Sequence, residues 1–148
     1  MGQRWKIGIA VILAVLLTAA ATGMRSAQTF TASDAAVQVN LVRGVEQILA
    51  GQGGIKLAPQ LVRTLERLRH ERGSTAAGRR GRTLAIQGFT WTLRGVRTQL
   101  DMAKYDSGNL EASVRDAKRA DRYLNRGANL LRAAGREFGI SIGKLNGH

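Results

Sequence analysis

The chain has 148 residues, one proline, no cysteine and a formal net charge of +13 at pH 7. This length supports one domain with a modest core, and the lack of cysteine excludes a disulfide framework. Few prolines and many alanine, leucine and arginine residues favour long helices over strands. We therefore predict an all-α fold.

The first residues have the order of a secretory signal. Arg4 and Lys6 precede an uncharged apolar run from Ile7 to Ala21 that ends in small residues. A basic start, an apolar run and small residues before a cleavage site are the three parts of such a signal. Residues 7–24 also reach the ~17 apolar residues that are the practical minimum for a membrane span.

Two outcomes stay open for this segment: it is cleaved after export, or it is retained as a membrane anchor. The two outcomes put the rest of the protein in different locations. We predict that residues 1–21 are a signal peptide or an uncleaved membrane anchor and that residues 22–33 are a tether. Residues 34–148 then form a single basic helical-bundle domain, either exported to the periplasm or cell surface or anchored at the inner membrane. Membrane association would run through residues 7–24.

The first part of the domain has the pattern of two helices separated by glycines. Ser33 or Asp34 is the expected N-cap of the first helix, and residues 51–54 (GQGG) end it. Pro59 is the expected first residue of the second helix, where its missing N–H costs nothing. The predicted apolar stripes are Val37, Leu41, Val45 and Ile48 in the first helix and Leu61, Leu65 and Leu68 in the second.

A glycine-rich basic connection, residues 73–82, is expected before a third helix. The apolar seam of that helix, with alternating steps of three and four, is Ile86, Phe89, Leu93, Val96, Leu100 and Ala103. Gly81, Gly88 and Gly95 are seven residues apart beside the seam. A mid-helix glycine costs about 0.5–1 kcal/mol relative to alanine, a cost that is tolerable where a neighbouring backbone comes close. Close packing is therefore predicted along these glycines, the alternative being a tolerant surface helix.

Residues 105–109 (YDSGN) predict a turn, with Ser107 as the cap of a fourth helix from Leu110 to near Phe138. The third and fourth helices should pack as an antiparallel hairpin. The apolar stripe of the fourth helix is Leu110, Val114, Ala117, Ala120, Leu124, Ala128 and Leu131. Almost opposite this stripe lies a predicted basic ridge of Arg115, Arg119, Arg122 and Arg126.

Residues 108–114 (GNLEASV), followed by Ala120, resemble the turn and second helix of a tetratricopeptide repeat. The chain has no second copy at the period of about 34 residues that such repeats show. We interpret the resemblance as a shared helical hairpin and assign no family from it.

The sequence offers no constellation for catalysis or for a cofactor. Residues 73–80 (GSTAAGRR) are similar to a phosphate-binding loop, but Arg79 replaces its lysine and Arg80 replaces its magnesium-binding hydroxyl. His70 and His148 lack partners at metal-ligand spacing, so no metal site is predicted. The protein is therefore expected to be non-enzymatic, with no cofactor.

The sequence does not determine whether Trp91 and Asp121 are buried or exposed. Trp91 lies about 200° around the helix from Phe89, so it either anchors a partner from an exposed position or belongs to a bundle that surrounds this helix. Asp121 lies at the edge of an apolar stripe and is either buried against an arginine or, as we favour, a boundary residue that reaches water.

The predicted role is that of an interaction module for anions. The candidate contact residues are Arg79, Arg80, Arg82, Arg115, Arg119, Arg122 and Arg126. Net positive charge attracts anionic lipid, an acidic wall polymer or an acidic protein, although a GC-rich genome and solubility also explain many arginines. If the domain instead faces the cytoplasm from a membrane anchor, nucleic acid or the anionic inner leaflet is the expected partner.

Overall fold

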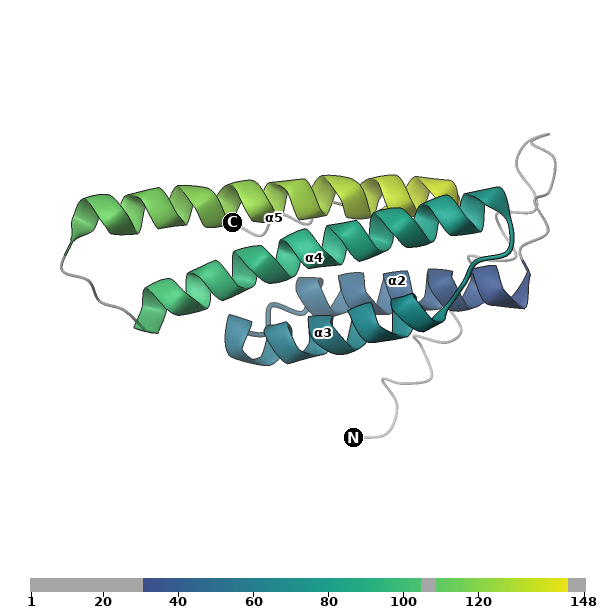
Figure 1. Ribbon diagram of the computed structural model, residues 1–148, viewed down its shortest axis with the longest axis horizontal. Helices are drawn as coiled ribbons and strands as arrows, with labels where there is room; N and C mark the ends of the chain where they lie inside the picture. Colours follow the sequence, from purple (N-terminus) through teal and green to yellow (C-terminus); the bar gives the residue numbers. More distant parts are fainter. Residues whose placement is uncertain (1–30, 105–108, 144–148) are drawn as a thin grey trace.

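The computed structural model describes residues 31–104 and 109–143, and in these ranges the chain forms a bundle of four helices (Figure 1). The helices are α2 (Ala32–Leu49), α3 (Gly54–His70), α4 (Ala76–Lys104) and α5 (Leu110–Glu137). No strand occurs in these ranges, so the predicted all-α bundle is confirmed. The predicted signal or anchor lies outside the described residues. Of the helices described, none is long and apolar enough to cross a membrane.

Helices α4 and α5 form the predicted antiparallel hairpin and make the most extensive contact between elements. The shorter helices α2 and α3 lie side by side against one flank of this hairpin (Figure 1). At the end where α4 leads into α5, the hairpin extends beyond the turn between α2 and α3 (Figure 1). Among the described residues, none therefore forms a second layer over this part of the hairpin.

The core lies where the α2–α3 pair meets the hairpin. Phe89 of α4 is fully buried at its centre, and its ring occupies the space where a side chain at Gly44 of α2 would lie. The predicted stripes of the first two helices are buried except for Ile48, which packs against the core while partly exposed. The buried apolar residues of this core are Val37, Leu41, Val45, Leu57, Leu61, Leu65, Leu68, Ala85, Phe89, Leu93, Val96, Leu131, Ala134 and Phe138.

Gly88 and Gly95 of α4 lie against α5, so the close packing predicted at these glycines is confirmed. A Cβ atom added at Gly88 would lie 2.8 Å from the side chain of Leu131, and one at Gly95 would lie 2.7 Å from Leu124. Gly127 of α5 is still more restricted, because its Cβ would lie 2.9 Å from the backbone carbonyl oxygen of Gly88. Real Cβ atoms essentially never come this close to another heavy atom. The absence of side chains therefore sets the short separation of the two helices.

Two expected helix starts differ from the structure. The N-cap of α2 is Thr31, whose hydroxyl accepts a hydrogen bond from the backbone N–H of Asp34, so Asp34 lies inside the first turn. Helix α3 begins at Gly54, and Pro59 lies inside the helix rather than at its start. Pro59 is exposed, and the proline costs the helix one backbone donor near its first turns, where core packing by Leu57 and Leu61 offsets the loss.

One further boundary was also wrong in the sequence-based prediction, whereas the predicted start of the fourth helix at Leu110 is confirmed. Helix α4 begins at Ala76, so most of the expected glycine-rich connection is helical. Its glycines lie on the packed side of the helix, where burial offsets their low helix propensity. Asn109 caps α5 by accepting a hydrogen bond from the N–H of Ala112 at 3.2 Å, whereas the expected cap, Ser107, lies outside the described residues.

Asp34 links the start of α2 to the start of α4. Its buried carboxylate accepts hydrogen bonds from the backbone N–H of Ser74 at 2.8 Å and of Thr75 at 3.3 Å. Burial acts to raise the pKa of Asp34, but hydrogen bonds from the Thr75 hydroxyl and from nearby backbone N–H groups outweigh it, and the pKa lies below its ordinary value of 3.8. Next to this contact, the hydroxyl of Thr31 is hydrogen-bonded to that of Ser74.

Gly127→Ala should lower the free energy of unfolding by about 1–3 kcal/mol, because the added methyl group meets the backbone of α4 and forces the helices apart. Alanine would otherwise favour the helix. Urea unfolding followed by circular dichroism measures the effect. Gly143→Ala is the matched control, since a Cβ there has nothing within 4 Å. Equal stability of the two variants would contradict close packing at Gly127.

Stability should also fall in acid through Asp34. Because its pKa is lowered in the folded state, the ionised carboxylate stabilises the fold above the unfolded pKa, and this contribution is lost as the pH falls through the folded value, below 3.8. Asp34→Asn should cost about 1–3 kcal/mol at neutral pH and flatten the acid dependence. Unfolding free energies across pH, with exposed Asp121→Asn as control, would show this. An unchanged acid slope in the Asp34 variant would contradict the assignment.

Candidate anion-binding surface

Four arginines form an exposed ridge along α5. The ridge comprises Arg115, Arg119, Arg122 and Arg126, and all four residues are exposed. Their steps of four, three and four residues place them on one face of the helix over a length of about 16 Å. Within the described parts of the chain, the ridge forms one ion pair, between Arg119 and Asp116 at 3.4 Å. The face therefore keeps a large excess of positive charge.

The opposite stripe of α5 fixes the orientation of the ridge. Ala120, Ala128 and Leu131 are buried, which turns the ridge away from the core. Leu110 and Val114 belong to the same predicted stripe, yet they are 79% and 45% exposed. The reason is the greater length of the hairpin, since neither the end of α2 nor the start of α3 reaches the first turns of α5 (Figure 1).

Trp91 connects the ridge to α4. Its ring packs against Tyr123 of α5, with centroids 5.3 Å apart and planes tilted by 43°. The guanidinium of Arg126 lies 4.3 Å from the centroid of the Trp91 ring, and that of Arg94 lies 4.8 Å from it. Trp91 is thus half-buried where α4 meets α5. Its environment is intermediate between the two that its position in the sequence allowed, a fully exposed surface residue and a residue covered by other helices.

Tyr123 and Arg94 were missed as candidates from sequence. Arg94 follows Trp91 by three residues, and side chains at this spacing on a helix contact each other. This contact could therefore have been predicted from the sequence. The contacts of Trp91 with Tyr123 and Arg126 cross from one helix to another. They depend on which residues of α4 and α5 come level with each other along the hairpin, which no pattern within one helix specifies.

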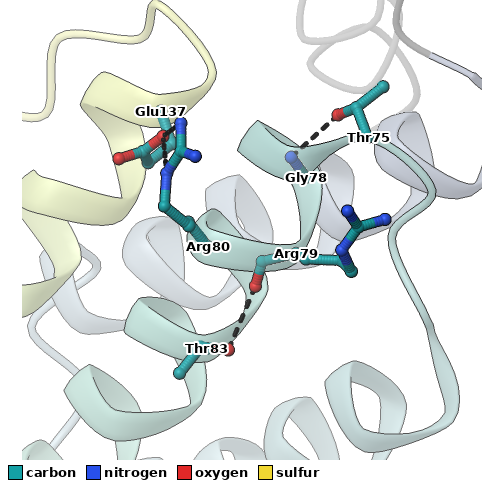
Figure 2. Close-up of polar contacts among 6 residues, drawn as sticks. All are labelled: Thr75, Gly78, Arg79, Arg80, Thr83 and Glu137. Atoms are coloured by element: carbon teal, nitrogen blue, oxygen red, sulfur yellow. Dashed lines mark hydrogen bonds and ion pairs between the residues drawn. The ribbon is translucent and has the colours of Figure 1, made fainter.

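The other candidate arginines occupy the first turns of α4 and point in different directions. Arg80 reaches across to α5, where its Nε and Nη2 atoms contact Glu137 Oε2 at 3.1 and 3.0 Å (Figure 2). Arg79 lies on another side of the helix and donates to the carbonyl oxygen of Ser74 at 2.6 Å. These two arginines do not meet at one point, and each has a partner within the chain.

Arg82 caps the C-terminal end of α3. Its Nε donates to the carbonyl oxygen of Leu68 at 2.8 Å, and its Nη2 donates to that of Arg69 at 2.9 Å. The last carbonyl groups of a helix have no partners inside it, so a cation there supplies both hydrogen bonds and favourable charge. Arg82 thus supports the bundle, whatever it contributes to anion binding.

The loop that is similar to a phosphate-binding loop already holds an anion from the protein itself. The N–H groups of Ser74 and Thr75 donate to the Asp34 carboxylate, and the Thr75 hydroxyl accepts a hydrogen bond from the N–H of Gly78 at 2.9 Å (Figure 2). A phosphate at this helix start would have to replace a buried carboxylate. This geometry explains why the loop does not offer its amides to a nucleotide.

A small cleft lies where all four helices meet. It has a volume of about 240 Å³ and apolar walls from Leu57, Val96 and Leu124. Asp121 lines its edge and is exposed, so the interpretation of Asp121 as a boundary residue is confirmed. In the described ranges, no three His, Asp or Glu residues gather closely enough to hold a metal ion.

Comparisons of the chain with protein-family models, with curated proteins and with solved structures find no match. The tetratricopeptide-like segment therefore gains no support as a family signature. Functional inference has to rest on the surface of the bundle itself.

Arg82→Gln should lower the free energy of unfolding by about 1–2 kcal/mol, because two charge-assisted hydrogen bonds to the end of α3 are lost. Exposed Arg97→Gln, on the same helix and with the same change in charge, should have little effect. Urea unfolding of both variants makes the comparison. If the two variants unfold alike, Arg82 does not stabilise α3.

Proposed function

We propose that the protein is an exported or membrane-anchored, non-enzymatic helical interaction module whose arginine-rich faces contact an anionic surface or an acidic partner. The observation that carries the proposal is the exposed ridge of Arg115, Arg119, Arg122 and Arg126 on a rigid helix. The proposal assigns no catalytic residue, metal or cofactor. Candidate partners are anionic lipid, an acidic wall polymer or an acidic protein.

Electrostatics supports this role. Like charges at successive turns of one helix face repel each other by a few tenths of a kcal/mol per pair, so the bare ridge destabilises the helix slightly. Binding of an anionic partner relieves that repulsion and releases counterions. Because the side chains project from a helix packed along its opposite side, their spacing is set before binding. The first turns of α4 contribute Arg79 as a further exposed charge near the other end of the hairpin, while the charge of exposed Arg80 is paired with Glu137.

The compartment is proposed from the sequence of residues 1–21 alone. In the alternative, the same apolar segment is retained as an anchor while the bundle faces the cytoplasm, where nucleic acid or the inner leaflet would meet the arginines. Arg25 directly follows the apolar segment and further arginines begin at Arg43, and basic residues beyond an apolar segment are typical of a cytoplasmic flank, so this alternative stays open.

Topology reporters joined after His148 separate the two compartments. We expect activity from a reporter that functions only after export and none from one that functions only in the cytoplasm. The reverse result would exclude the export proposal while leaving anion binding untouched.

Replacing all four ridge arginines with glutamine should weaken binding to anionic vesicles and to polyglutamate. For vesicles, the expected loss is about three orders of magnitude, since each arginine near an anionic membrane contributes on the order of 1 kcal/mol. Binding of the unmodified chain should also weaken steeply as salt is added. Co-sedimentation with vesicles and fluorescence titration with the polymer provide the measurements.

The matched control removes the same charge from α3 and the loop that follows it. Its four substitutions to glutamine are at exposed residues away from the ridge, namely Arg63, Arg67, Arg69 and Arg72. We expect this variant to keep most of the binding. Equal losses in the two variants would mean that net charge, and not the ridge, governs attraction.

A further inference from the structure

Trp91 holds two arginines from different helices over one aromatic ring. Arg94 comes from α4 and Arg126 from α5, and both guanidinium groups lie within 5 Å of the ring centroid. An arginine within about 6 Å of a tryptophan face is attracted to it by the ring quadrupole. Tyr123 packs against the same ring and limits its movement. These contacts therefore favour positions of the two guanidinium groups beside the ring.

This cluster widens the basic surface beyond a single helix. We define the hairpin outer face as Trp91, Arg94 and Tyr123 together with the four ridge arginines, Arg115, Arg119, Arg122 and Arg126. Arg126 belongs to both the ridge and the cluster, so the two are continuous. Because the buried stripe of α5 and the buried seam of α4 face the other helices, this face points away from the α2–α3 pair.

The chemistry of the face fits phosphate groups arranged in a plane. Guanidinium groups pair with phosphate oxygens, often through two parallel hydrogen bonds. Tryptophan and tyrosine are the residues enriched at the level of lipid headgroups, because they combine an apolar ring with a polar N–H or O–H group. The hairpin outer face supplies both kinds of residue along one straight helical pair.

Single-stranded nucleic acid fits this face less well. Proteins that bind it use aromatic rings as platforms on which bases stack, and such stacking needs a free ring face. Around Trp91, two guanidinium groups and the Tyr123 ring already take up the contacts that a base would make. The face thus retains attraction for a phosphate backbone but offers little for the bases.

We propose that the hairpin outer face docks on an anionic phospholipid bilayer, with Trp91 acting as a positioning residue that holds Arg94 and Arg126 toward the headgroup phosphates. This inference rests on the proposed function and names the partner surface within it. The apolar residues 7–24, which have the length of a membrane segment, would keep the bundle beside such a surface if they are retained.

Quenching of Trp91 fluorescence tests which face meets the bilayer. The full chain carrying Trp5→Phe leaves Trp91 as its single tryptophan. Vesicles of phosphatidylglycerol and phosphatidylcholine would carry a spin label near the headgroup or near the end of the acyl chain. We expect strong quenching by the headgroup label, weak quenching by the deep label, and none with vesicles of phosphatidylcholine alone. Absence of quenching on anionic vesicles to which the chain binds would overturn the proposal.

Matched substitutions test the positioning role. Arg94→Gln should weaken binding to the anionic vesicles about threefold more than Arg97→Gln, although both remove one exposed charge from α4. Trp91→Leu should weaken binding about tenfold, and Trp91→Phe, which keeps an aromatic face, should restore part of the loss. Circular dichroism checks that each variant remains helical. If Arg94→Gln and Arg97→Gln bind equally, Trp91 does not position Arg94.

These outcomes separate this inference from the proposed function. If the ridge variant loses binding to vesicles and to polyglutamate while Trp91 is not quenched and Arg94→Gln behaves as Arg97→Gln, anion binding stands and docking of this face fails. If the unmodified chain binds no anionic probe, the proposed function fails as well. Tighter binding to an unstructured oligonucleotide than to the vesicles, with Trp91 quenched by its bases, would overturn the lipid assignment in favour of nucleic acid.

Discussion

The close contact between α4 and α5 is the constraint on which the rest of the bundle depends. Gly88, Gly95 and Gly127 remove the side chains that would otherwise separate the two helices. Each glycine lowers the stability of its helix, so packing along the whole hairpin has to offset that loss. At this separation a side chain of α4 can lie against a ring of α5, and Trp91 and Tyr123 do so. The same glycines that weaken each helix thus allow the contact between Trp91 and Tyr123 on the outer side of the hairpin.

Much of this architecture was predictable because it follows from repeated local patterns. Apolar stripes of three- and four-residue steps identified the buried faces of α2 and α3 and the middle of the buried seam of α4, where Phe89 lies at the centre of the core. At the ends of that predicted seam, Ile86 and Leu100 are only partly buried and Ala103 is exposed. The seven-residue spacing of Gly81, Gly88 and Gly95 indicated close packing, which the structure confirms. The exposure of the α5 ridge followed from its position opposite an apolar stripe.

What could not be predicted involves partners that are distant in sequence. Glycine and arginine in residues 76–82 have the composition of a loop, and only burial of those glycines against other elements makes the segment helical. Arg82 was a candidate for external anions, yet its nearest acceptors are carbonyl groups at the end of α3. Likewise, Leu110 and Val114 are exposed because the α4–α5 pair is longer than the α2–α3 pair. The apolar stripe of α5 does not indicate this difference in length.

The carboxylate of Asp34 also has a consequence for how the bundle would sit on a charged target. It neutralises the start of α4, the end of the hairpin where helix dipole and arginines together would attract anions most strongly. A phosphate arriving there competes with an internal anion that is already desolvated and hydrogen-bonded. The remaining attraction is concentrated along the side of the hairpin, so a target surface would meet the bundle lengthwise rather than end-on. Asp34 would thereby help to favour one orientation of the bundle on a negatively charged target.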